Sequence, residues 1–190
     1  MSSLTKVFKL PKKTISLWII ATFVLCLNFA PLLFNFIWGN HDWMPLISSN
    51  NLKSGLIEGR FSQYIFLNLL FSGNILPILN IIIGFIAYTL SIILLTTKVF
   101  NFNIKNLSQT LIILSAITLP YIIEILYFQF ICLTQLIWPL IIVTSIYYAK
   151  KASQQNKVIN TTISLILLLL AVGGYPASIN MFLTILSSKE

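Results

Sequence analysis

Long apolar stretches separated by short polar segments run through the chain, and several reach the roughly 20 residues that a helix needs to cross a bilayer. The alternation of apolar and polar residues that is typical of strands is absent. A bundle of helices pairs each backbone amide inside its own segment, which lipid requires. The pattern therefore predicts helical spans over residues 14–38, 75–97, 130–148 and 159–172, and a further one from residue 107 to the outer side near residues 121–127.

Two weaker apolar segments complete the pattern. Residues 61–71 include Gln63 and Asn68, and this mixture favours a helix that lies along the membrane interface. Residues 181–186 look like the start of a sixth span that the chain does not complete. We expect one all-α integral membrane module over residues 1–190, a polytopic bundle of five to six spans. The short sixth segment indicates either a reading frame that stopped early or a partner half that is encoded separately.

Composition supports the membrane interpretation. Apolar residues make up 57% of the chain and charged residues only 8%, whereas soluble domains carry roughly 25% charge. The basic flank and apolar core of the first stretch resemble a signal peptide, but the stretch is longer than an apolar signal region of about 7–15 residues. We therefore expect an uncleaved first helix.

The net charge of +8 could suggest nucleic acid as a partner, but the distribution of lysines excludes it. The lysines cluster before the first predicted span and after the second and fourth, as the positive-inside rule requires. This places the N-terminus in the cytoplasm and predicts contact with anionic lipid headgroups. The excess of lysine over arginine, with abundant Ile and Asn, is typical of an AT-rich bacterial genome, so we expect the bacterial cytoplasmic (inner) membrane. The clusters are Lys6, Lys9, Lys12 and Lys13; Lys98 and Lys105; and Lys150, Lys151 and Lys157.

Carboxylates are scarce, and two of the four are candidates for chemistry. Asp42 follows the first span at the outer boundary, where a carboxylate can take a proton from an acceptor hydroxyl. The alternative is a solvated acid that caps a helix near Trp43. Glu124 lies at the outer end of the third span, and ionisable residues at membrane depth usually face a polar cavity. Its alternative is an acid at headgroup level.

Three further residues belong to the candidate site. Arg60 is the only arginine, and its planar fork suits a phosphate, although an interfacial cation paired with Glu58 or lipid is an equal interpretation. His41 is the only histidine and fits an interfacial residue better than a base. Tyr175 follows two glycines that could simply end a helix.

The sequence offers no set of metal ligands. A lone histidine beside one aspartate does not complete a metal site. Cys26 and Cys132 lie inside apolar stretches, where we expect them to act as small buried hydrophobes. We expect neither a metal nor a cofactor.

In their order, five segments resemble the membrane glucosyltransferases typified by bacterial O-antigen glucosyltransferases of the GtrII type. Where that family usually reads Tyr-Gln-Ala-Ser, Pro176 stands in place of the glutamine. The resemblance covers the N-terminal part of the family, whose members are longer. The segments are residues 41–43 (His-Asp-Trp), 54–61 (Ser-Gly-Leu-Ile-Glu-Gly-Arg-Phe), 75–77 (Ile-Leu-Pro), 120–124 (Pro to Glu) and 175–179 (Tyr-Pro-Ala-Ser-Ile).

The resemblance implies a GT-C-like module that uses polyprenyl-phosphate glucose as donor and a cell-surface glycan, such as the O-antigen of lipopolysaccharide, as acceptor. It implies Asp42 as the catalytic aspartate, and we assign substrate binding to Arg60, Glu124, His41 and Tyr175. Two functions stay open: an inverting glycosyltransferase or its N-terminal part, and a non-catalytic membrane protein, either a truncated remnant or an accessory or transport subunit.

Overall fold

The computed structural model describes residues 10–31, 61–62, 64–66, 77–118, 129–175 and 178–187. These residues form helices and short connections and include no strand, which confirms the predicted all-α class. Residues 61–62 and 64–66 are helical as well. The elements with assigned bounds are α2 (Lys12–Asn28), α7 (Pro77–Leu94), the π-helical turn η2 (Leu95–Val99), α8 (Leu107–Ile117), α10 (Gln129–Ala152), α11 (Lys157–Gly174) and α12 (Ser178–Ser187).

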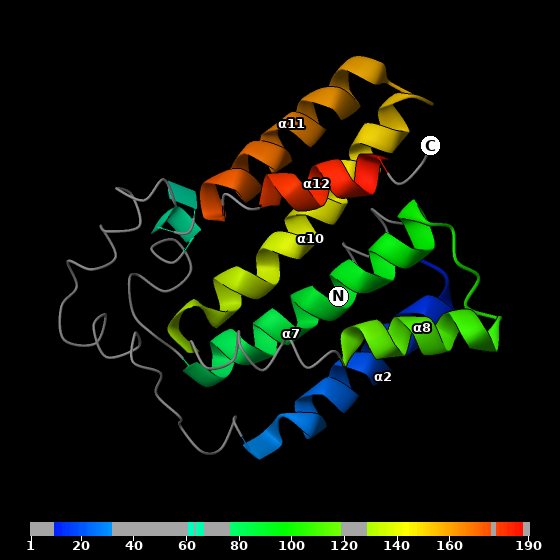
Figure 1. Cartoon of the computed structure of the whole chain (residues 1–190), viewed down its shortest axis with the longest axis vertical. Helices are drawn as coiled ribbons and strands as arrows, with labels where there is room; N and C mark the ends of the chain where they lie inside the picture. The colour runs from blue at the N-terminus through cyan, green and yellow to red at the C-terminus, as the bar shows by residue number, and fades with distance from the viewer. Residues whose placement is uncertain are drawn as a thin grey trace.

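Helices α7 and α10 form the centre of the bundle and run side by side (Figure 1). Helices α2 and α8 pack on α7, whereas α11 and α12 pack on α10. Phe85 and Ile93 of α7 and Val143 and Ile146 of α10 are fully buried. The core therefore lies along the contact between the two central helices.

The helices alternate in direction, so the described lysines gather at one end of the bundle. Lys150, near the end of α10, donates hydrogen bonds to the carbonyls of Lys98 and Val99 at 3.4 and 3.3 Å. The start of α2 lies beside the end of α7, and short turns lead from this end into α8 and α11. We call this end of the bundle the lysine end and the other end of the bundle the opposite end. The lysine end carries Lys12, Lys13, Lys98, Lys105, Lys150, Lys151 and Lys157.

Neighbouring helices are joined by hydrogen bonds between small polar side chains. Ser145 of α10 donates to the carbonyl of Ser164 on α11 at 2.8 Å, and Ser164 donates to the carbonyl of Ser145 at 2.9 Å. The hydroxyls of Thr22 on α2 and Thr89 on α7 lie 2.8 Å apart. Small residues with such hydrogen bonds let helices approach closely, as they do in membrane bundles.

Two helices in the described part of the chain are long and apolar enough to cross a membrane, by length and composition. They cover Ile78–Val99, with 22 residues, and Lys157–Gly174, with 18 residues. One or two such helices are a weak indication of a membrane protein. They correspond to the second and fifth predicted spans, while Leu107–Ile117 is a shorter apolar helix. Much of the outward surface is apolar, including Phe23 on α2 and Leu165 and Leu169 on α11, each more than half exposed.

Candidate functional site

Of the five predicted site residues, Tyr175 lies within the described structure. It directly follows α11 and leaves the helix in an extended conformation, with its backbone N–H bound to the carbonyl of Ala171 at 2.9 Å. Its side chain is 38% exposed, so the phenol is accessible at the opposite end. His41, Asp42, Arg60 and Glu124 lie outside the described residues, and their roles stay predictions.

Two adjacent glycines hold the backbone before Tyr175 against aromatic rings. A side chain at Gly173 would overlap the ring of Phe61, and one at Gly174 would overlap the indole of Trp138. Only glycine allows this approach, because any Cβ would occupy the space of a ring. The packing fixes the last turn of α11 on α10 and on the short helical segment that begins at Phe61.

This contact joins two parts of the chain that are distant in sequence. Phe61 is the residue after Arg60, and Gly173 and Gly174 precede Tyr175. Phe66 extends the same aromatic cluster, with its ring centroid 6.3 Å from that of Trp138. Phe61, the last residue of one segment that carries the family resemblance, therefore lies against the turn of α11 that leads into Tyr175, the first residue of another.

Two buried polar atoms near this end have no hydrogen-bond partner within the described part of the chain. They are the hydroxyl of Ser62 and the side-chain carbonyl of Asn80. Ser62 follows Phe61, and Asn80 lies in the first turn of α7. An unpaired buried polar group costs about 1–3 kcal/mol, so such groups usually have a water or ligand as partner.

All three side chains carry uncharged groups that can form hydrogen bonds. The Ser62 hydroxyl and the Tyr175 phenol can donate and accept hydrogen bonds, and the Asn80 carbonyl accepts them. Sugar hydroxyls match such groups. The described residues contain no cluster of His, Cys, Asp or Glu that could hold a metal ion. The chain's four acids all lie outside the described residues.

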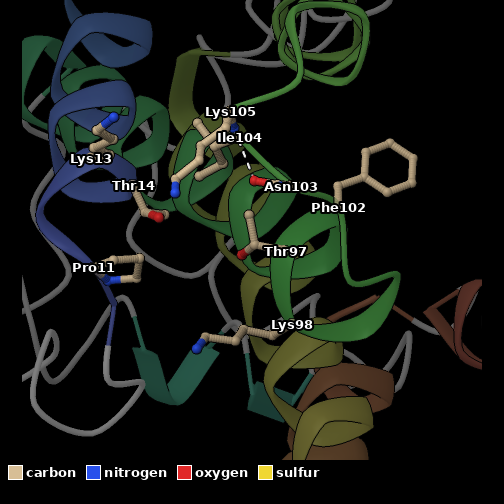
Figure 2. A pocket seen from close by; sticks show the side chains of 9 residues that line it. All are labelled: Pro11, Lys13, Thr14, Thr97, Lys98, Phe102, Asn103, Ile104 and Lys105. Carbon is tan, nitrogen blue, oxygen red and sulfur yellow. Dashed lines mark hydrogen bonds between the residues drawn. The ribbon is translucent and has the colours of Figure 1, made fainter.

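The structure also reveals a cavity at the lysine end that the sequence does not indicate. Its walls come from the start of α2, the π-helical turn η2 that follows α7, and the loop before α8 (Figure 2). The sequence identifies the lysines there as determinants of topology only. No local pattern could have found the cavity, because it arises from how three distant segments meet.

Comparisons of this chain with protein-family models, curated proteins and solved structures returned no match. The resemblance to GtrII-type glucosyltransferases therefore stays a prediction.

Proposed function

We propose that the chain is a membrane glycosyltransferase that moves a glucosyl group from a polyprenyl-phosphate donor to a cell-surface glycan such as O-antigen. One observation carries the proposal: the residues next to Arg60 and Tyr175 pack together at the end of the bundle that lies away from the lysines. This packing supports the assignment of Arg60 and Tyr175 to one site.

The proposed setting is the bacterial cytoplasmic membrane, with five to six spans, a cytoplasmic N-terminus and a GT-C-like arrangement. The exposed apolar side chains of α2 and α11 support an apolar surrounding. The lysines at one end support a cytoplasmic location for that end. The opposite end would then face the outer leaflet, where a lipid-linked sugar can enter sideways from the bilayer.

In the proposed reaction, the acceptor hydroxyl oxygen attacks the anomeric carbon of glucose. The bond from that carbon to the phosphate oxygen breaks, and polyprenyl phosphate leaves with the electron pair. Asp42 takes the proton of the acceptor hydroxyl, and Arg60 holds the phosphate through its planar fork. A single displacement inverts the anomeric centre. The donor is already activated, so the proposal requires no cofactor.

The uncharged groups of the opposite end would bind the sugar. The unpartnered Ser62 hydroxyl and Asn80 carbonyl gain hydrogen bonds from sugar hydroxyls, which removes the cost of leaving them unpaired. The exposed phenol of Tyr175 would contact the acceptor or donor at the rim. We assign His41 and Glu124 to substrate binding at the same boundary.

Transfer of labelled glucose from polyprenyl-phosphate glucose in membranes tests the proposal. We expect transfer by the wild-type chain and a loss of about 100-fold or more in Asp42→Asn, because general bases contribute roughly 10²–10⁴-fold. Glu190→Gln removes a different acid and serves as the control, with transfer retained. No transfer by wild type, with or without a separately encoded partner half, would favour the non-catalytic alternative. Wild-type transfer in Asp42→Asn would reject the assigned base.

A further inference from the structure

We propose that Asn80 selects the donor sugar by accepting a hydrogen bond from one of its hydroxyl groups. This inference rests on the proposed glycosyltransferase function and adds a specificity-determining residue to the same site. Asn80 lies in the first turn of α7, at the opposite end of the bundle. The segment 75–77, which carries part of the family resemblance, leads directly into this turn.

Other buried polar side chains of the described bundle have hydrogen-bond partners that explain their place in the fold. Ser91, on the same helix as Asn80, is buried and donates to the carbonyl of Tyr88 at 2.7 Å. Asn160 of α11 is 5% exposed, and its side-chain amide N–H donates to the carbonyl of Gln155. Such pairing is the rule for polar groups inside proteins, because it offsets the loss of water.

The side-chain oxygen of Asn80 departs from this rule. It is buried and has no hydrogen-bond partner within the described part of the chain. The whole residue is 1% exposed, so bulk water does not compete for this oxygen. An unpaired buried group destabilises the protein that carries it. Groups that lower stability in this way are typical of functional sites, where stability and activity oppose each other.

The chemistry of an amide oxygen defines the group that it selects. This oxygen accepts hydrogen bonds and cannot donate one. Its partner must therefore carry a hydrogen atom that it can donate, as a sugar hydroxyl does and an ionised phosphate does not. A site that binds a hydroxyl in this way rejects an analogue without it, because the buried acceptor then stays unpaired.

The same reasoning separates Asn80 from Ser62, the other residue with an unpaired buried oxygen. A serine hydroxyl rotates and can donate or accept, so it tolerates either kind of partner. The side-chain oxygen of Asn80 tolerates donors only. We therefore assign the selection among sugars to Asn80, and not to Ser62.

The thermal midpoint of the ligand-free chain in detergent tests whether Asn80 lowers stability. Asn80→Leu keeps the branching of the side chain and removes the unpaired oxygen, so the midpoint should rise by about 2–4 °C. Asn160→Leu is the matched control, because it makes the same exchange but breaks the bond to Gln155, and its midpoint should fall. A fall in both variants would show that Asn80 has a structural partner and would overturn the proposal.

Donor binding, measured without acceptor, tests the selection itself. The probes are polyprenyl-phosphate glucose and analogues in which a single hydroxyl is replaced by hydrogen or by fluorine. Fluorine keeps nearly the size of the hydroxyl but cannot donate a hydrogen bond. We expect both replacements at one particular hydroxyl to weaken binding to the wild-type chain by about 5- to 150-fold, the fold-change for one buried polar group left unpaired.

The variants show whether Asn80 is the residue that detects this hydroxyl. Asn80→Leu should bind the parent donor and the two altered donors with affinities within about twofold of each other, whereas Asn160→Leu should discriminate as wild type does. Several results would overturn the proposal: unchanged discrimination in Asn80→Leu, equal weakening or loss of all donors in that variant, a fluorine analogue at that hydroxyl that binds as the parent does, or no donor binding by wild type.

Two separate readouts distinguish this inference from the proposed function. Discrimination that depends on Asn80, without transfer to any acceptor, would overturn the transferase reaction and leave the sugar-selecting role in place. Transfer by wild type with unchanged discrimination in Asn80→Leu would overturn this role alone.

Discussion

At the scale of single residues, Gly173 and Gly174 decide how closely α11 approaches its neighbours. Their missing side chains leave room for the ring of Phe61 and the indole of Trp138. Trp138 is 4% exposed, so its fused ring has little freedom to move aside. A methyl group at this point must therefore displace a helix rather than a flexible side chain.

Gly174→Ala should lower stability by about 1–3 kcal/mol, the usual range for overpacking a filled core. The thermal midpoint of the full chain in detergent measures this loss. Leu169→Ala provides the control, because Leu169 lies on the same helix but is 62% exposed. Equal midpoints for wild type and Gly174→Ala would show that the aromatic cluster can shift at no cost.

At the scale of helices, sequence reasoning identifies the elements better than their contacts. The apolar lengths predict segments at 75–97 and 159–172, and the structure has helices at Pro77–Leu94 and Lys157–Gly174. The length of an apolar stretch can be read directly from the local sequence, so such helices are predictable. The π-helical turn at Leu95–Val99 has no such local signal.

The contacts between helices were not predictable in the same way. Ser145 and Ser164 are unremarkable polar residues in apolar stretches, and nothing in the sequence indicates that they face each other. Their role depends on the register of α10 against α11, which is set by packing along the whole helix pair. The packing of Gly173 on Phe61 also depends on how distant segments are placed, so the sequence does not predict it.

Ser145 and Ser164 should be coupled energetically. Each hydroxyl donates to the other residue's carbonyl, so removing either one breaks part of a shared network. Ser145→Ala and Ser164→Ala should each cost about 0.6–1.7 kcal/mol, the measured scale for such bonds in membrane bundles. Unfolding in detergent by a denaturant, for both variants and their combination, measures the coupling.

Thr162→Ala is the control for this cycle. The Thr162 hydroxyl is exposed and bonds to Val158 within its own helix, so its loss should change stability by less than about 0.5 kcal/mol. Strictly additive effects of the two serine variants would contradict the proposed coupling.

At the scale of the whole molecule, the two ends of the bundle differ in chemistry. The lysine end carries every described basic residue and a cavity whose lining includes three of them. The opposite end carries aromatic rings, two glycines and unpartnered uncharged polar atoms. The sequence predicted this division of charge, because lysine clusters recur at intervals of two spans. It could not predict the packing at either end, which joins segments from distant parts of the chain.

The proposed orientation predicts which end of the molecule is accessible from outside the cell. In a background where Cys26 and Cys132 are replaced by alanine, Ser49→Cys should react with an impermeant maleimide in intact cells. Gln155→Cys lies in the exposed turn at the lysine end and should react only after the membrane is opened. The two positions should differ because, in the proposed orientation, the lysine end faces the cytoplasm. The reverse pattern of labelling would place the lysine end outside and would separate Asp42 from an outer-leaflet donor.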